Sequence, residues 1–246
     1  GLPLGVDGET LSGVVDGIRF LRGVNNGEHA SLGAQVAVIG GGNTAVDCAR
    51  TAKRLGSESV RLVYRRTREE MPAAGEEIEA LLHEGIEIDF LAAPVRFEGA
   101  GGKVAKMECV RMELGEADES GRRRPVPKAG SEFTIPVDCV ITALGQAVQT
   151  SFLESIGIAM GKGGTVTIDP STGATNIEGV FAGGDVVTGP AYVVDAIAAG
   201  KKAARSIGAY LRGEAFSGEE PGDEPQKLSG EELEALTGRI SPQHRI

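Results

Sequence analysis

A short apolar segment that runs directly into a glycine cluster constrains the fold of this chain more than any other feature. Residues 36–39 read Val-Ala-Val-Ile, which is typical of a parallel strand that is covered on both faces. The following residues, Gly40 to Ala45, fit the pattern G-x-G-x-x-A, and a helical pattern continues from about Thr44 to Leu55. A strand, a glycine turn and a helix in this order indicate a turn whose backbone binds an anion.

The positions of this glycine pattern each have a physical reason. The first glycine, Gly40, allows the tight turn, and Gly42 lets the backbone approach a pyrophosphate, while Ala45 permits close packing of the helix on the strand. The free N–H groups and the dipole at the helix N-terminus favour the phosphates. The sequence therefore predicts a dinucleotide site; the alternative is a glycine-rich turn without a ligand. The residues of the predicted site are Gly40, Gly42, Asn43, Thr44 and Ala45.

The end of the next predicted strand, over residues 60–64, indicates which nucleotide is bound. A site for NAD places Asp or Glu there to hold the ribose 2′-hydroxyl, whereas this chain has Arg65 and Arg66. Two guanidinium groups bind a 2′-phosphate through charge-assisted hydrogen bonds, and a carboxylate would repel it. NADPH is therefore the expected nucleotide. The alternative is a surface cluster of arginines that balances Glu69 and Glu70.

The order of the predicted elements indicates an α/β fold. Strands and helices alternate from residue 36 to residue 91, which is the signature of a parallel sheet. Short antiparallel strands follow between residues 95 and 135, and an apolar strand over 137–144 returns to the parallel sheet. We therefore expect a Rossmann-like domain made of a parallel sheet plus an antiparallel meander. The run Arg122-Arg123-Arg124 beside one turn is interpreted as a solvated hairpin tip.

Changes in pattern divide the chain into four segments. In the first segment Val14, Ile18, Leu21 and Val24 are spaced like one face of a helix. The last segment is acidic and rich in Pro and Gly, with one weak helix around residues 231–236, and it is expected to lack a packed core. The expected segments are a lead-in with a helix over 1–32, the nucleotide-binding domain over 33–147, part of a second α/β domain over 148–213, and an acidic tail over 214–246.

Charge and composition exclude several classes of function. A formal net charge of −10 and an aromatic share of 4% argue against nucleic-acid binding, which needs a positive field or stacking rings. No apolar run approaches the roughly 20 residues that span a bilayer, so no membrane contact and a cytoplasmic location are expected. Cys48, Cys109 and Cys139 lie far apart in the sequence, and we expect buried, inert thiols and no metal site.

The second informative motif ends in Gly-Gly-Asp. Residues 175–185 read TNIEGVFAGGD, and a strand over 180–182 is expected to lead into Gly184 and Asp185. This motif resembles the C-terminal flavin signature of flavoproteins with two dinucleotide-binding domains. The resemblance implies that Asp185 holds a hydroxyl of the ribityl chain. It also implies that a long helix, expected to open at Pro190 and end near Leu211, points its positive end at the flavin through the backbone N–H groups of Val193 and Val194.

Four motifs together are similar to the small (beta) subunit of NADPH-dependent glutamate synthase, a resemblance that covers about residues 5–212. It implies hydride transfer between NADPH and FAD, and passage of single electrons to iron–sulfur centres on a partner, a large subunit or an adjacent domain. Gly145 is then placed near the nicotinamide, and no catalytic acid–base residue is required. The four motifs are GGGNTAVD at 40–47, VYRRTREEMP at 63–72, ALGQ at 143–146 and FAGGD at 181–185.

The chain departs from that family in two respects. The family has a first glycine motif, which binds the ADP half of FAD, and cysteine-rich cluster-binding segments, and this sequence contains neither. We therefore expect a fragment whose partner is the N-terminal FAD-binding half, with a naturally split subunit as the alternative. A dithiol reductase such as thioredoxin reductase is not expected, because no CxxC pair precedes Gly40. A nucleotide-binding module without turnover is the alternative for the isolated chain.

Overall fold

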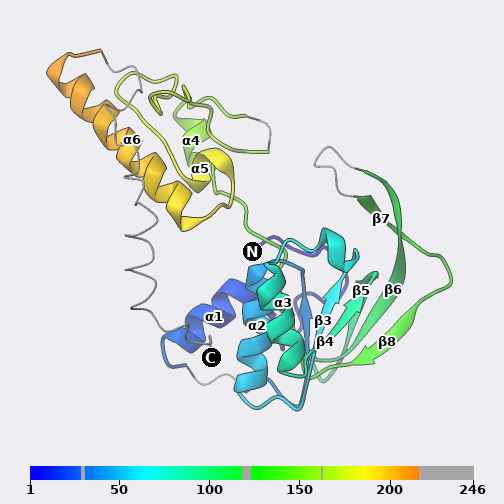
Figure 1. The fold of residues 1–246 in the computed structure, drawn as a ribbon. Helices are drawn as coiled ribbons and strands as arrows, with labels where there is room; N and C mark the ends of the chain where they lie inside the picture. Colours follow the sequence, from blue (N-terminus) through cyan, green and yellow to red (C-terminus); the bar gives the residue numbers. More distant parts are fainter. Residues whose placement is uncertain (29–30, 118–122, 162, 216–246) are drawn as a thin grey trace, which may run out of the picture. The chain divides into compact units, whose positions relative to one another are not determined.

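The computed structural model describes residues 1–28, 31–117, 123–161 and 163–215 (Figure 1). The contacts within the chain divide it into two units, Gly1–Ala147 and Val148–Ile246, and each is described here by itself. The helix expected around residues 231–236, most of the acidic tail and Arg122 lie outside the described residues. No helix in the described part combines the length and the apolar character that crossing a membrane requires.

A five-stranded parallel sheet forms the centre of the first unit. Its strands lie in the order β1-β9-β2-β3-β4, and every neighbouring pair is parallel. Helices α1 (Gly17–Asn25), α2 (Asn43–Arg54) and α3 (Gly75–His83) cover one face of this sheet (Figure 1). The strands are β1 (Val14–Asp16), β2 (Gln35–Ile39), β3 (Ser59–Tyr64), β4 (Glu87–Phe90) and β9 (Cys139–Thr142).

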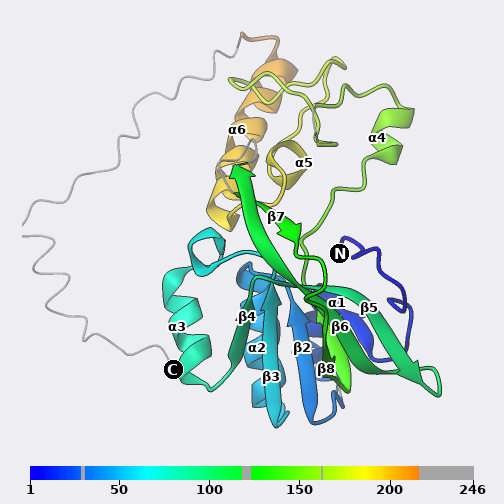
Figure 2. The same ribbon diagram turned by 90° about the vertical axis from the view of Figure 1, so that its right-hand side faces the viewer.

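Antiparallel strands cover the opposite face of the parallel sheet. Strand β6 pairs with β5, with β8 and, towards its C-terminal end, with β7 (Figure 2). The expectation of a parallel sheet plus an antiparallel meander is confirmed. The strands are β5 (Ala92–Ala100), β6 (Lys103–Ala117), β7 (Arg123–Pro127) and β8 (Phe133–Pro136).

Strand β2 shows why its apolar run is continuous. Val36 and Val38 belong to the core between the sheet and the helices, whereas Ala37 and Ile39 belong to the core between the sheet and the meander. Successive side chains of a strand point to opposite faces. A strand that is covered on both sides therefore needs apolar residues at every position, and here all four are buried.

The lead-in segment differs from its prediction. Val14, expected on a helix face, lies in strand β1 and pairs in parallel register with Val140 of β9. Helix α1 begins only at Gly17, where the Asp16 side chain accepts a hydrogen bond from the backbone N–H of Arg19 at 2.9 Å. Two adjacent valines favour a strand, and Asp is a preferred N-cap residue. Residues 1–32 thus supply the edge strand and one helix of the first unit.

The second unit contains helices but few paired strands. Helices α4 (Ser151–Ser155), α5 (Asp185–Thr188) and α6 (Val193–Arg212) are its regular elements. The strand expected over 180–182 is reduced to an isolated bridge between Ala174 and Phe181, and a second isolated bridge joins Met160 to Val166 among the described residues. These segments have extended backbone, but the described part of this unit provides no neighbouring strand that completes a sheet around them.

The long helix of the second unit also begins later than expected. Helix α5 was not predicted; it ends at Gly189, whose φ of +76° terminates the turn. Pro190 lies in the connection, and α6 begins at Val193 with Tyr192 as its N-cap. A proline suits a first helical turn, but it suits a connection equally well, so its position alone does not fix the start of the helix.

Candidate functional site

The glycine turn after β2 is shaped by close contacts with two other strands. Gly40 has a φ of +145°, and a Cβ atom there would stand 2.3 Å from the carbonyl oxygen of Ala143, which follows β9. A Cβ atom on Gly41 would stand 2.4 Å from the ring of Tyr64, at the end of β3. Both positions therefore require glycine so that the chain can pass between its neighbours.

Gly42 has a different reason for being glycine. Its φ of −91° suits any residue, and no protein atom lies within 4 Å of the position that its Cβ would take. It is the N-cap residue of α2, where no side chain caps the helix. An open space directly before an uncapped helix N-terminus is where the backbone can approach an anion. The site therefore fits the pyrophosphate expected from the sequence.

The other residues of the predicted dinucleotide site differ in how far they are buried. Ala45 is fully buried against the glycine turn, while Thr44 is half-buried. The Asn43 side chain accepts a hydrogen bond from the backbone N–H of Ala74 at 3.0 Å, which ties the start of α2 to the segment before α3. Because this amide points at Ala74, the helix N-terminus is left to its own backbone N–H groups.

The loop between β3 and α3 is fastened to the glycine turn. The hydroxyl of Tyr64 donates a hydrogen bond to the carbonyl of Glu70 at 2.7 Å, and the N–H of Ala73 donates to the carbonyl of Gly41 at 3.1 Å. The loop therefore lies beside the glycine turn at the carboxyl ends of β2 and β3. A nucleotide whose pyrophosphate lies at Gly42 would carry its ribose towards this loop.

The two arginines at the end of β3 have different surroundings. Arg65 is exposed, whereas Arg66 is only 6% exposed and its Nε donates a hydrogen bond to the carbonyl of Arg123 at 2.8 Å. Neighbouring arginines pair with carboxylates on the surface: Arg61 lies 2.8 Å from Asp89, and Arg68 pairs with Glu79. The structure thus places a cationic loop at the diagnostic position, with Arg65 directed to solvent.

Arg123 belongs to the arginine run interpreted as a solvated tip, and its side chain is half-exposed but also makes an ion pair. Its Nε lies 2.7 Å from Oε1 of Glu70, in the loop after β3. The hydrogen bond from Thr67 and the charge of Arg123 lower the pKa of the Glu70 carboxyl. Sequence reasoning missed this contact because 53 residues separate the partners. A carboxylate three residues after Thr67 signals only the local capping box that both residues form.

The end of β9 lies next to the end of β2. The N–H of Ala143 donates a hydrogen bond to the carbonyl of Ile39 at 2.8 Å, and Gly145 follows with a φ of +104° and no atom within 4 Å of its Cβ position. From β2 the chain continues to β3 on one side, while β9 lies on the other side. Such a reversal of strand order is where open α/β sheets bind ligands.

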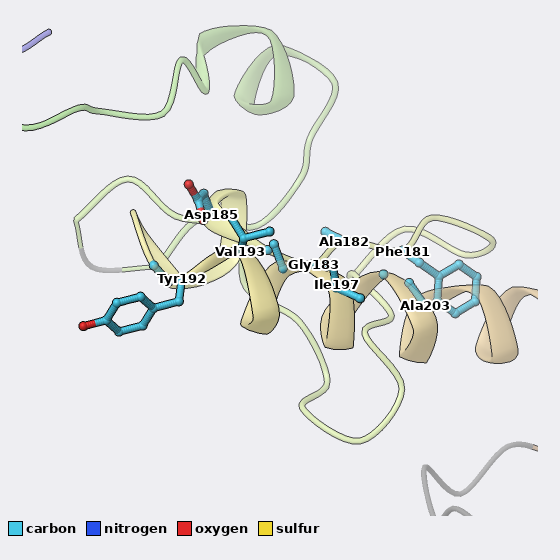
Figure 3. A pocket seen from close by; sticks show the side chains of 12 residues that line it. Phe181, Ala182, Gly183, Asp185, Tyr192, Val193, Ile197 and Ala203 are labelled. Atoms are coloured by element: carbon cyan, nitrogen blue, oxygen red, sulfur yellow. The ribbon is translucent and has the colours of Figure 1, made fainter. Parts of the chain in front are cut away.

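A pocket in the second unit brings together Gly184, Asp185 and Val193 of the flavin residues expected from the sequence, whereas Val194 is not among its lining residues (Figure 3). Gly184 has a φ of +72°, which lets the chain turn directly before Asp185, the exposed first residue of α5. Tyr192 and Val193 line the same pocket at the start of α6, where no side chain caps the helix. The carboxylate and the helix N-terminus therefore face one pocket, as a ligand with hydroxyl groups and an electron-poor ring requires.

The start of α6 presents an apolar face that the described part of the chain does not cover. Tyr192, Val193 and Val194 are 70–74% exposed, and the buried residues of the helix, Ser206 and Ala209, lie in its last third. An exposed cluster of large apolar residues marks a binding surface. The first half of α6 is thus available to a ligand or to further protein.

The family model for pyridine nucleotide-disulphide oxidoreductases matches residues 2–200 of this chain. The chain belongs to this family. Curated relatives include the beta subunit of NADP(+)-dependent formate dehydrogenase from Moorella thermoacetica, which is 50% identical over 212 residues. They also include the beta subunit of NADPH-Fe(3+) oxidoreductase from Geobacter sulfurreducens, 42% identical over 234 residues, and the small chain of glutamate synthase [NADPH] from Azospirillum brasilense, 42% identical over 193 residues.

These relatives are longer than the chain. The matched regions cover 85%, 85% and 77% of this chain but only 30%, 35% and 40% of the three relatives. The expected resemblance to the glutamate synthase small subunit is confirmed at the level of the family. This pyridine nucleotide-disulphide oxidoreductase chain thus spans about a third of the length of the curated relatives it matches.

Solved structures share the fold at low sequence identity. Thioredoxin reductase from T. acidophilum has a TM-score of 0.67 at 23% identity, over 86% of this chain and 62% of that one. The complex of Mycobacterium tuberculosis FprA with NADPH has a TM-score of 0.65 at 20% identity, over 86% of this chain and 61% of that one. Both likenesses support the α/β architecture of the family.

The cysteines of this family member are not arranged for disulphide chemistry. Cys48, Cys109 and Cys139 are buried and free. Burial raises the pKa of the first two thiols to about 12 and that of Cys139 to about 11. The prediction that these thiols are buried is confirmed, and since the thiolate is the reactive form, the raised pKa values agree with the expectation of low reactivity.

Proposed function

We propose that this chain forms the NADPH-binding portion of a flavoprotein oxidoreductase that transfers hydride between NADP(H) and FAD. The observation that carries the proposal is the pairing of the open Gly42 turn with a cationic loop after β3, where Arg65 and Arg66 replace the carboxylate of an NAD site. The cofactors supply the redox chemistry when they are bound, and the protein binds and orients them. The names of the three relatives, each of which includes NADP(+) or NADPH, support the choice of nucleotide.

The residues of the first unit have the following proposed roles. The backbone at Gly42, Asn43 and Thr44 binds the pyrophosphate at the uncapped start of α2. The arginines after β3 select the 2′-phosphate by charge. Gly145, which follows β9 and has open space where a Cβ would lie, is placed beside the nicotinamide half. No side chain is assigned a proton transfer, because a hydride step between two rings requires orientation alone.

The second unit is proposed to hold the ring and ribityl portions of FAD. Asp185 accepts a hydrogen bond from a ribityl hydroxyl, and Gly184 gives the ligand close access to the backbone. The backbone N–H groups of Val193 and Val194 point the positive end of α6 at the flavin, which stabilises negative charge on its ring. The ADP half of FAD is assigned to a further FAD-binding segment, and the next electron acceptors to iron–sulfur centres of a partner or large subunit.

The proposed nucleotide selectivity is tested by Arg65→Ala. We expect NADPH binding to weaken by about 1.5–3 kcal/mol, the contribution of a hydrogen bond to a charged group, with little change in NADH binding. Titration of the chain with both nucleotides measures the difference. The matched control is Arg54→Ala, which removes the same charge from the C-terminal end of α2. Equal losses for NADPH and NADH would reject the assignment of the 2′-phosphate.

The proposed flavin role is tested by Asp185→Ala in the longer protein that contains both FAD-binding segments. FAD retention through dialysis should fall, because a carboxylate hydrogen bond to the ribityl chain is lost. NADPH binding should stay nearly intact, since Asp185 and the glycine turn belong to different units. Asp195→Ala, in the first turn of α6, is the control that removes a nearby carboxylate. Full flavin content in the Asp185 variant would contradict the role.

The alternative is a nucleotide-binding module that has no turnover of its own. It is favoured for the isolated chain by the uncovered apolar face of α6. The flavin spectrum of the purified chain and an assay of NADPH oxidation separate the two.

A further inference from the structure

Two hydrogen bonds of a single residue, Arg123, link strand β7 to the loop after β3. The carbonyl of Arg123 accepts the Nε–H of Arg66 at 2.8 Å, and the Nε–H of Arg123 donates to Oε1 of Glu70 at 2.7 Å. Arg66 directly precedes Thr67, the cap of the single turn of 3-10 helix over Arg68–Glu70, and Glu70 is the last residue of that turn. The backbone and the side chain of Arg123 therefore fix both ends of the same short loop.

Burial distinguishes Arg66 and Glu70, the two partners of Arg123, from Arg65, while the Arg123 side chain itself is 51% exposed. Arg66 is 6% exposed and the Glu70 side chain is 9% exposed, whereas Arg65 lies at the surface. A buried charge is costly unless it is hydrogen-bonded, so a buried guanidinium whose Nε–H meets a carbonyl serves structure first. Arg65 is the exposed member of the pair, and it is free of that structural constraint on its position.

We propose that strand β7 acts as a clamp on the loop that selects the nucleotide, with Arg66, Glu70 and Arg123 as positioning residues and Arg65 as the contact to the 2′-phosphate. The inference rests on the proposed NADPH site and refines it, because it divides the roles of the two arginines. It also adds the β6–β7 hairpin, which is remote in sequence, to the determinants of nucleotide preference.

Replacing Glu70 tests the clamp, because the clamp and a purely electrostatic role predict opposite changes in NADPH affinity. A carboxylate beside a 2′-phosphate repels it, so a Glu70 that acted by charge alone would weaken NADPH binding, and its removal would strengthen that binding. If Glu70 instead holds Arg123 and the loop, its removal weakens NADPH binding. Glu70→Gln is suitable because Gln also satisfies the capping box with Thr67, while the ion pair with Arg123 is reduced to a weaker hydrogen bond from the guanidinium to a neutral amide.

The experiment measures the dissociation constants of NADPH and NADH for the 246-residue chain and its variants. We expect Glu70→Gln to lower the preference for NADPH over NADH by roughly five- to tenfold, up to about 1.4 kcal/mol. In an Arg123→Met background the same substitution should cause no further loss, since the partner is already gone. Glu113→Gln is the control, because it disrupts an exposed ion pair with Lys128 within the same hairpin.

The outcomes separate the clamp from the proposed function. Tighter or unchanged NADPH binding in Glu70→Gln, or equal effects with and without Arg123, would overturn the clamp. A wild-type chain without preference for NADPH, or an Arg65→Ala variant that keeps the full preference, would overturn the proposed site itself. Arg123→Lys should rescue part of the preference that Arg123→Met loses, because the cation can still reach Glu70. Denaturation midpoints of all variants show whether a loss reflects unfolding; a loss of preference that tracks the midpoint alone counts against the clamp.

Discussion

The Gly40→Ala substitution is expected to destabilise the first unit by about 3 kcal/mol or more, whereas Gly42→Ala is expected to leave its stability within about 1 kcal/mol. At Gly40 the backbone has a φ of +145°, and the added Cβ would stand 2.3 Å from the Ala143 carbonyl. A non-glycine residue in such a conformation costs on the order of 1–3 kcal/mol, and the strand ends must also separate. At Gly42 the φ is ordinary and the space is open.

For NADPH binding, Gly42→Ala is the variant expected to show the direct loss, although it is the less destabilised of the two. In Gly42→Ala the Cβ projects into the open space before α2, where the pyrophosphate is proposed to lie, so the folded variant should bind NADPH at least roughly tenfold more weakly, or by about 1.4 kcal/mol. Denaturant titration gives the stabilities, and nucleotide titration gives the affinities. NADPH binding by Gly42→Ala equal to that of the wild type would remove this turn from the site. A Gly40→Ala variant of normal stability would contradict the geometry of the turn.

The central strands β2 and β3 of the parallel sheet could be predicted from sequence because most of their residues are apolar and each strand leads into a turn or loop. Residues 36–39 and 60–64 were expected as strands, and the structure has Gln35–Ile39 and Ser59–Tyr64. A strand covered on both faces must be apolar throughout, so the pattern is unambiguous. The edge strand Val14–Asp16 was missed because three residues are too few to show the alternating pattern of a strand. Val14 also fits the helical spacing of the residues that follow.

Sequence reasoning could propose site residues only where they lie close in sequence to the strand or helix that positions them. The glycine turn and Arg65 stand next to their strands in sequence, so their relation is visible there. The contacts of Arg123 with Arg66 and Glu70 depend on how the β6–β7 hairpin packs against the loop after β3, and no short pattern encodes this. Helix α5 was missed for the same reason as β1, since four residues cannot show a helical period.

The 246-residue chain, purified alone, is expected to be colourless or nearly so and to show no NADPH oxidation with artificial acceptors. FAD is a dinucleotide, and its pyrophosphate needs a glycine turn and a helix N-terminus of its own. The one G-x-G-x-x-A turn of this sequence lies at residues 40–45 and is followed by Arg65 and Arg66, which suit NADPH. The pocket at Asp185 would then hold the ring and ribityl portions of FAD without the ADP half.

The second unit supports this expectation through its packing. Among its described residues, strand pairing is limited to two isolated bridges, and the first half of α6 exposes Tyr192, Val193 and Val194. The pocket is lined by residues 181–185 and by the start of α6, and the exposed side chains of this helix show that it buries little of a ligand. Affinity falls about tenfold for each 1.4 kcal/mol of binding free energy that is lost. The first unit has a sheet with cores on both faces, so it should fold and bind NADPH regardless.

The measurement is the absorbance spectrum of the purified chain, together with an NADPH titration and a turnover assay on the same preparation. NADPH binding without flavin absorbance is the expected result, and it would show that the first unit is intact while the flavin site is incomplete. Exposed apolar residues on α6 should also promote self-association, which light scattering detects. A yellow preparation with about one flavin per chain would contradict the prediction. It would mean that the chain, alone or paired with a second copy, completes the flavin pocket from its own residues and covers the apolar face of α6.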